Sequence, residues 1–272
     1  MAVPMTRERW HPFPEIEVLG VPFVVSTFDE LVHYLLRTSL EPDDGPYPRR
    51  LATVSIPLLV YAQEDLDVRA LLARSFMNLP DGMPAVWVGR WKGARGMEKV
   101  RGPSLMARLL AESRARPVRH YFCGGLPGVA EQLRARAQAR WGPIPIVGTF
   151  SPPFRPMTED EVRALAAEMD ALEVDIVWMG ISSPKQDHLA ERLARYSRRV
   201  RYFIPVGGAF DMLSGRVPEA PRWMHTTGME WFFRMMHEPR RLAPRYLRVI
   251  PRFLRYAAQD LWSHWRNRRG RT

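Results

Sequence analysis

The stretch HYFCGGLPGVAEQLRARAQARWGPIPIVGTF, residues 120–150, carries the pattern that decides the fold. Its apolar start, His120–Cys123, predicts a buried strand, the glycines that follow predict a turn, and residues 129–141 predict a helix. Residues 146–150 predict a second strand. A strand, a glycine turn, a helix and another strand in this order are typical of a parallel sheet covered by helices.

The same rhythm continues toward the C-terminus. Thr158 and Glu161 form the sequence signature of a capping box, which predicts a helix up to about Leu172. Two more strands are expected at 174–180 and 202–206, with a loop and a helix between them. The sequence therefore predicts an α/β fold with a Rossmann-like, largely parallel sheet flanked by helices, and a basic helical C-terminal appendage. Residues 41–50, rich in proline and aspartate, are expected to form a loop.

The composition of the 272-residue chain is that of a globular protein, with 46% hydrophobic residues and a net charge of +11. Such a basic chain is expected to meet an anionic partner: nucleic acid, a membrane surface or a phosphorylated substrate. The single cysteine, Cys123, is interpreted as a packed thiol because it lies in an apolar stretch beside two glycines. No signal-peptide pattern or run of about 20 apolar residues is present, so any membrane contact is expected to be peripheral.

Most of the charge lies in the C-terminal segment. From Arg234 onward there are eleven arginines against two acidic residues, a net charge of +9. We therefore expect a catalytic α/β region at 1–233 and a basic amphipathic appendage at 234–272. In the appendage, apolar residues recur every three or four positions, and four arginines between them are assigned to a membrane surface: Arg240, Arg245, Arg248 and Arg252. The alternative is a helix packed on the body. Pro244 and Pro251 are expected to break or kink any single helix.

Three polar or glycine-rich loops follow predicted strands, at 124–128, 182–186 and 207–211. Ligands of such sheets bind at the carboxyl ends of the strands, so these loops predict a nucleotide pocket. The candidate binding residues are Gly124, Gly125, Lys185, Gln186, Gly207 and Asp211. Simpler interpretations remain open for several of them: glycines required by tight turns, a surface lysine at a helix start, and an aspartate that caps a helix.

Asp81 lies in the turn LPDGMP, residues 79–84, and is a candidate general base. Spacing alone favours a different role, an aspartate that caps the following helix. The one Asp-x-Asp pair, Asp65 and Asp67, opens a predicted helix, where acidic residues complement the helix dipole, so a metal role is disfavoured. The sequence has no HExxH, paired CxxC or P-loop motif. No metal and no cofactor are expected.

Six motifs in order resemble the WecG/TagA/CpsF family of bacterial glycosyltransferases, also called glycosyltransferase family 26, from about Val18 to Arg255. They are LPDGMPAVWVGR (79–90), KVRGPSLM (99–106), YFCGGLPGVAEQL (121–133), DIVWMGISSPKQD (175–187), VGGAFDMLSGRVPEAPRWM (206–224) and GMEWFFRMMHEPRRL (228–242). The resemblance implies metal-independent, inverting transfer from a UDP-sugar to a polyprenyl-diphosphate-linked glycan. It places the protein in the cytoplasm, peripherally on the inner face of the cell membrane. Such enzymes build teichoic-acid linkage units, enterobacterial common antigen or exopolysaccharide.

The resemblance also implies roles for individual residues. Asp81 matches the proposed base, Thr53 lies near the acceptor, and Gln186 is the glutamine of the PKQ motif. Arg234 and Arg241 match arginines that are thought to complete the pocket over the diphosphate.

This chain departs from the family pattern at Ser55, Lys99, Ser104 and Asp187, where the family usually has Asn, Arg, Asp and Glu. Lys99 is still expected to contact a substrate, although it lacks the bidentate fork of arginine. The donor sugar can therefore be N-acetylmannosamine, glucose or another hexose.

Two other functions compete with this interpretation. A nucleotide-sugar-modifying enzyme would need a GxGxxG turn with an acidic partner about 20 residues later, a spacing that this chain lacks. A nucleic-acid binder would use the arginine-rich segment. Nucleic acid is not expected as a partner, whereas the family resemblance suggests a homo-oligomer.

Overall fold

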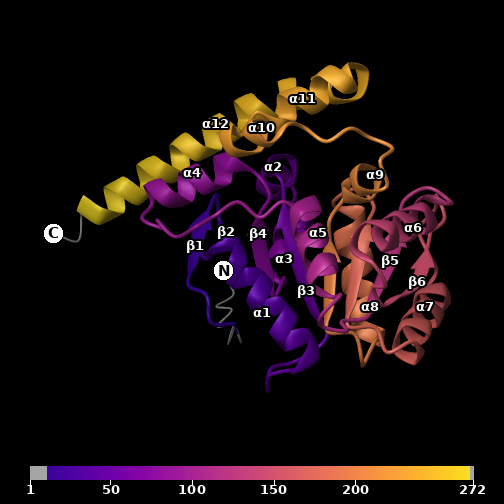
Figure 1. The fold of residues 1–272 in the computed structure, drawn as a ribbon. Helices are drawn as coiled ribbons and strands as arrows, with labels where there is room; N and C mark the ends of the chain where they lie inside the picture. The colour runs from indigo at the N-terminus through magenta and orange to yellow at the C-terminus, as the bar shows by residue number, and fades with distance from the viewer. Residues whose placement is uncertain (1–10, 270–272) are drawn as a thin grey trace.

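A six-stranded parallel sheet forms the centre of the computed structural model, which describes residues 11–269 apart from the side chains of Arg222, Thr226 and Arg241. The strand order is β4-β3-β8-β7-β5-β6, and every neighbouring pair is parallel (Figure 1). The strands are β3 (Arg49–Val54), β4 (Met77–Pro80), β5 (His120–Gly124), β6 (Ile146–Phe150), β7 (Ile176–Gly180) and β8 (Tyr202–Pro205). The expected α/β fold with a parallel sheet is confirmed.

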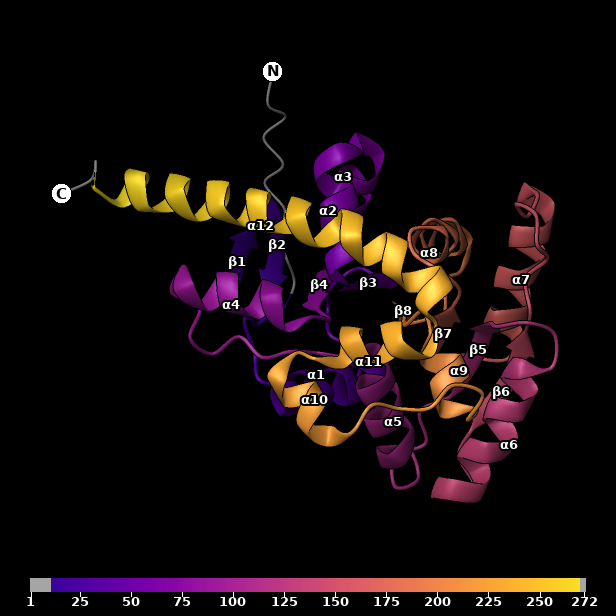
Figure 2. The ribbon, with the colours of Figure 1, turned by 90° about the horizontal axis from the view of Figure 1, so that it is seen from above.

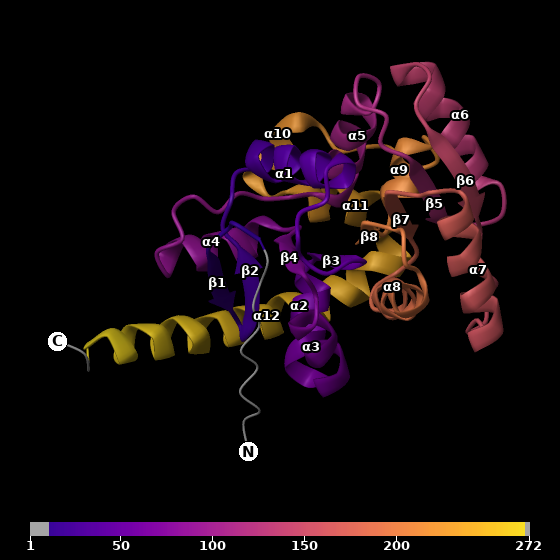
Figure 3. The same ribbon diagram turned by 90° about the horizontal axis from the view of Figure 1, so that it is seen from below.

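Helices cover both faces of this sheet (Figure 3). One face carries α1 (Phe28–Leu40), α5 (Gly102–Glu112), α6 (Val129–Trp141) and α9 (Ala209–Leu213), and the other carries α2 (Ile56–Glu64), α3 (Leu66–Ala73), α7 (Glu159–Ala171) and α8 (Lys185–Tyr196). Strand β5 shows why both faces need cover. Phe122 packs into one core, Tyr121 and Cys123 into the other, and all three are fully buried.

A small antiparallel hairpin, β1 (Glu15–Val18) and β2 (Val21–Val24), lies beside the β4 edge of the sheet together with α4 (Met83–Trp91). The last three helices lie above the carboxyl ends of the sheet strands (Figures 1 and 2). They are α10 (Arg222–Thr227), α11 (Glu230–His237) and α12 (Pro239–Arg269).

Several local predictions are confirmed. The helix at 129–141 and the strand at 146–150 have the expected bounds. Thr158 caps α7: its hydroxyl accepts from the Glu161 N–H at 3.2 Å, and its own N–H donates to the Glu161 carboxylate at 2.8 Å. The expected loop at 41–50 is two residues too long, because Arg49 and Arg50 already belong to β3. Arg49 tolerates burial there because its guanidinium pairs with Asp43.

The expected break at Pro244 and Pro251 does not occur, whereas the expected kink stays a prediction. α12 is one helix of 31 residues that contains both Pro244 and Pro251. A proline inside a helix leaves the carbonyl four residues earlier without its partner. Those carbonyls belong to Arg240 and Leu247, both exposed, so water can hydrogen-bond to them.

α12 packs on the body through one face. Val249, Phe253 and Ala257 are buried in a core shared with β1, β2, α2 and α4. Asp260 adds a polar anchor: its carboxylate lies 2.8 Å from Lys92 Nζ and accepts the Leu19 N–H at 3.0 Å. Within the described residues no helix is long and apolar enough to cross a membrane. The division of the chain after residue 233 stays a prediction.

Candidate functional site

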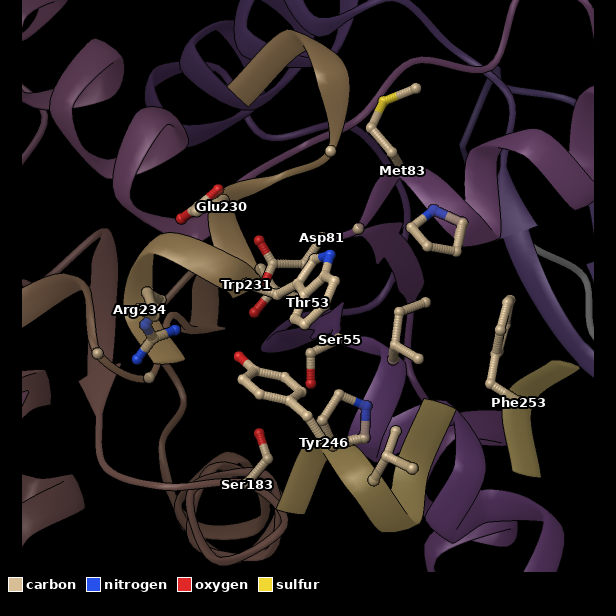
Figure 4. A pocket seen from close by; sticks show the side chains of 18 of the residues that line it. Thr53, Ser55, Asp81, Met83, Ser183, Glu230, Trp231, Arg234, Tyr246 and Phe253 are labelled. Carbon is tan, nitrogen blue, oxygen red and sulfur yellow. The ribbon is translucent and has the colours of Figure 1, made fainter. Parts of the chain in front are cut away.

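A cleft of about 800 Å³ opens at the carboxyl edge of the sheet, between the strand ends and helices α11 and α12. Its floor comes from the ends of β3, β4, β7 and β8, and α4 forms part of its wall. This is the edge at which parallel α/β sheets bind their ligands. The expected pocket at the sheet edge is therefore present, and residues from distant parts of the sequence meet in it (Figure 4).

Asp81 lies at the end of β4 and lines this cleft. Its carboxylate accepts the N–H of Gly102, at the start of α5, at 3.2 Å. The helix that follows Asp81 has Gly82 as its N-cap and receives no side-chain cap, so Asp81 does not cap α4. Burial raises the pKa of Asp81 to about 6, and the nearby charge of Glu230 adds to the rise. The opposing influences are Arg101, the Gly102 N–H and Arg234.

Glu230 belongs to a buried charge network that the sequence interpretation missed. Arg101, only 5% exposed, lies 2.8 Å from the Glu230 carboxylate and 3.1 Å from that of Glu219. His225 Nδ1 lies 3.2 Å from the Glu230 carboxylate. Burial alone would raise the pKa of Glu230, but Arg101 and His225 outweigh it and lower the pKa. The network fastens α10 and α11 against the loop that carries the N-terminus of α5.

Lys99, two residues before Arg101, also lines the cleft. Its ammonium donates to the backbone carbonyl of His225. Burial lowers the pKa of the Lys99 ammonium. The negative charges of Glu230 and Asp81 oppose that shift, and the positive charge of Arg101 adds to it. Lys99 therefore ties α10 to the floor of the cleft.

Thr53 and Ser55 follow one another at the end of β3 and also line the cleft. The Thr53 hydroxyl donates to the carbonyl of Pro205 at 2.6 Å, a bond that joins β3 to β8. Ser55 is the N-cap of α2 but makes no side-chain cap bond. The position where the family has Asn therefore presents a hydroxyl to the cleft (Figure 4).

Gln186 connects two loops of the floor. Its amide donates to the Ser183 hydroxyl at 2.8 Å, and its oxygen accepts the Gly207 N–H at 3.0 Å. The side chain is 2% exposed, so both ends of the amide are already engaged. Gln186 and Gly207 line the cleft, and their bond fixes the β7 and β8 loops relative to each other.

Two arginines from the last helices line the cleft, and their side chains form no ion pair or hydrogen bond with another described residue. They are Arg234 of α11 and Arg245 of α12, and the Nε atom of each is buried without a partner there. Arg234 lies beside Gly208 of the floor, because a Cβ added to Gly208 would be 3.4 Å from Arg234 Nη2. Arg245 is one of the arginines that the sequence assigned to the membrane. The side chain of Arg241 lies outside the described residues.

The other three arginines assigned to the membrane do not line the cleft. Arg240 and Arg248 are exposed on α12. Arg252 is half exposed and lies 3.0 Å from the carboxylate of Glu64 on α2, so part of its charge is used to hold the helix.

Gly124, Gly125 and Lys185 also lie outside the cleft lining. Gly124 has φ +148°, and an added Cβ would be 2.5 Å from the backbone of Gly180. Gly125 donates its N–H to the carbonyl of Gly180 at 2.9 Å. These glycines permit close packing of the β5 turn on β7. Lys185 is exposed at the start of α8.

Asp211 is half exposed and lines the cleft, 3.7 Å from Arg216. Asp65 caps α3, since its carboxylate accepts the N–H groups of Asp67 and Val68. No group of three or more His, Cys, Asp or Glu side chains between residues 11 and 269 is arranged to hold a metal ion. Cys123 is buried, which raises the pKa of its thiol to about 12.

Aromatic side chains from the last helices also line the cleft, and the sequence interpretation did not single them out as site residues. Trp231 of α11 and Tyr246 of α12 line the cleft, with ring centroids 5.5 Å apart (Figure 4). Trp231 lies in the motif at 228–242, and Tyr246 is one of the apolar residues that recur every three or four positions in the appendage.

The whole arrangement lies within the match to one protein family. The family model of the WecG/TagA/CpsF glycosyl transferases matches residues 16–267. That range includes every strand end of the cleft floor and all but the last residues of α12. A family of this kind transfers a sugar from a sugar-nucleotide donor to a glycan acceptor. The chain belongs to the WecG/TagA/CpsF glycosyl transferase family.

Proposed function

We propose that this protein is an inverting, metal-independent hexosyltransferase that moves a sugar from a UDP-sugar to a polyprenyl-diphosphate-linked glycan. The observation that carries the proposal is the meeting of a carboxylate and two cations in one cleft. Asp81 has a raised pKa, and Arg234 and Arg245 have no acidic partner among the described residues. A base and an anion-binding group are what this transfer requires.

Asp81 is the proposed general base. Its carboxylate takes the proton of the acceptor hydroxyl, the hydroxyl oxygen bonds to the anomeric carbon, and the bond from that carbon to the UDP oxygen breaks. Attack from the face opposite UDP inverts the anomeric centre. A pKa of about 6 suits the role, because the group is ionised at neutral pH and still accepts a proton readily.

The negative charge that leaves on UDP needs stabilisation without a metal ion. The N-termini of α2 and α4 line the cleft at Ser55 and Gly82, and neither receives a side-chain cap. Each helix has a proline in its first turn, which removes one N–H, but the helix dipole still favours an anion there. Arg234 and Arg245 are proposed to bind the diphosphate of donor or acceptor from the opposite side, and the family resemblance adds Arg241 to this proposal.

The donor sugar is N-acetylmannosamine or a hexose such as glucose, and the product is a cell-surface polysaccharide or its linkage unit. Ser55 offers a single hydroxyl where the family has an amide, and Lys99 is already bonded to His225. Ser104 accepts a hydrogen bond from Arg101 at 3.1 Å. These differences change the polar groups offered to sugar hydroxyls.

The protein is proposed to act in the cytoplasm, peripherally on the inner face of the membrane. α12 exposes Leu247, Leu254 and Trp262 together with Arg240 and Arg248. Aromatic and apolar anchors with basic neighbours suit a membrane interface. Each arginine near anionic lipid contributes about 1 kcal/mol.

The transfer is tested with purified protein, a panel of UDP-sugars and a short-chain lipid-linked acceptor, with UDP release and glycosylated product measured together. Asp81→Asn is expected to lower the transfer rate at least a hundredfold. Asp160→Asn is the control, because Asp160 is exposed on α7 outside the cleft lining, and it should keep the rate. Full activity of Asp81→Asn would remove the base assignment.

The membrane proposal is tested by flotation with vesicles that contain anionic or only zwitterionic lipid. The intact protein should float with anionic vesicles, and replacing Arg240 and Arg248 by Gln should weaken flotation. A DNA mobility-shift assay on the same samples covers the nucleic-acid alternative. Tight, salt-sensitive DNA binding without flotation would favour that alternative.

A further inference from the structure

The cleft continues beyond its polar end into an apolar arm between α4 and α12. Every cleft-lining residue from α4 and from positions 249–261 of α12 is apolar. These residues are Met83, Pro84, Trp87, Val88, Trp91, Val249, Ile250, Phe253, Leu254, Ala257, Ala258 and Leu261. The arginines of α12 between positions 248 and 255 do not line the cleft, so the helix separates its charged and apolar faces here.

Large apolar side chains along this arm are open to solvent. Trp87 is 46% exposed, Trp91 74% and Leu254 60%. Soluble proteins seldom leave such side chains grouped in water unless a ligand or partner covers them. Ala258 also lines the arm and is exposed to solvent. From Val249 to Leu261 the arm follows α12 for about 18 Å, at 1.5 Å per residue.

The two ends of the cleft together define what fits. At one end are Asp81, Arg234 and Arg245, where neither arginine forms an ion pair with a described residue. At the other end is an apolar wall without polar side chains apart from indole rings. A ligand that satisfies both ends is an amphiphile with an anionic group joined directly to a linear hydrocarbon chain. A helix from another protein or a second copy would cover the wall, but it would also have to place a carboxylate at the polar end to satisfy the arginines.

We propose that the apolar arm binds the first isoprene units of the lipid-linked acceptor, so that the protein itself holds part of the chain outside the bilayer. The inference rests on the proposed function for the identity of the acceptor. The diphosphate then lies beside Arg234 and Arg245, and the sugar hydroxyl beyond it reaches Asp81. The chain leaves the arm near Leu261, beside the exposed Trp262 and Trp265.

The experiment measures binding of inorganic diphosphate and of geranyl, farnesyl and geranylgeranyl diphosphate to the full chain by calorimetry, without vesicles and below micelle concentrations. Burial of one methylene strengthens binding by at most about fourfold, so a gain of about tenfold or more per added isoprene unit is expected until the arm is full. Longer chains should then give no further gain.

Ala258→Trp fills the arm at a solvent-exposed position of α12. It should abolish the gain in affinity with chain length and leave the Kd of inorganic diphosphate unchanged. Gln259→Trp adds the same side chain one residue away, outside the cleft lining, and should keep the gain. Should Ala258→Trp fail to fold, Leu254→Gln removes an exposed apolar contact instead and should reduce the gain.

A Kd that does not change with chain length would overturn the inference. So would a gain that needs vesicles, because the bilayer would then hold the chain, or a gain that survives both arm variants. A dimer that Ala258→Trp dissociates would make the arm a subunit interface. Failure of the proposed function looks different: prenyl diphosphates would bind as described, but no UDP-sugar would be transferred to any lipid-linked acceptor.

Discussion

Replacing Asp81 by Asn should make the protein more stable while it stops transfer. The native pKa of Asp81 is about 6, whereas an aspartate in an unfolded chain has a pKa of about 3.9. The folded protein therefore favours the protonated carboxyl. That preference contributes stability in full below pH 4, and the contribution is lost as the pH rises through 6. Asparagine, which is neutral at every pH, avoids this loss.

The size of the effect follows from the two pKa values. Linkage predicts that Asp81→Asn gains about 3 kcal/mol of unfolding free energy at pH 8, about 1.5 kcal/mol at pH 5 and almost nothing below pH 3. The Asn side-chain oxygen can still accept the Gly102 N–H, so that bond need not be lost. Its new N–H₂ faces Glu230 on one side but Arg101 and Arg234 on the other, which reduces the expected gain at pH 8 to about 2 kcal/mol.

Urea unfolding followed by circular dichroism at pH 5, 6.5 and 8 measures the difference between the two proteins. Asp211→Asn serves as the control and should change stability by no more than about 0.5 kcal/mol at any of these pH values. A stability difference for Asp81→Asn that is zero, negative or independent of pH would refute the reasoning that the native carboxylate is held in a site unfavourable to its charge. Stabilisation together with loss of transfer would show that the site keeps the charge for function.

Three further predictions follow from contacts in and around the cleft. Glu230→Gln removes a charge that raises the pKa of Asp81, so the acidic limb of the kcat/KM profile for UDP release should move to lower pH; a limb that does not move would contradict the coupling. Gly124→Ala should cost about 3 kcal/mol in thermal or urea unfolding, because it adds a backbone clash to positive-φ strain, whereas Gly128→Ala, which has open space, should cost about 1 kcal/mol. Equal costs would show that the clash is relieved. Asp260→Ala should cost about 2 kcal/mol and speed proteolysis of α12, since a nearly buried lysine loses its partner; unchanged proteolysis would mean that apolar packing alone holds the helix.

The fold was predictable where its signals are local. The strand and helix at 120–141 carry apolar runs and glycine turns within a few residues, and the Thr158–Glu161 capping box closes over three positions. Local rules failed where distant contacts decide. Pro244 and Pro251 look like helix breakers, but the apolar face of α12 gains enough from packing on α2 and α4 to keep the helix continuous.

The candidate site shows the same limit. Spacing alone favoured Asp81 as a helix cap, whereas its carboxylate bonds to Gly102, 21 residues later. Arg101 and Glu230 are 129 positions apart in the sequence, and no local pattern around either residue predicts their ion pair. The family resemblance pointed to Asp81 because it carries information about contacts that periodicity does not contain. It did not single out the buried network that sets the pKa of that carboxylate.

α12 lines both the polar end of the cleft and its apolar arm. One face of this helix supplies apolar residues to the cleft wall, and Arg240 and Arg248 are exposed elsewhere on it. Because the helix is held to the body by Asp260 and by buried residues such as Phe253, its faces cannot turn independently of the cleft. An anionic surface that attracts the exposed arginines would therefore also set the direction in which the apolar arm opens. A lipid chain could then pass from the bilayer into the arm without crossing water, which would lower the cost of bringing its diphosphate to Arg234 and Arg245.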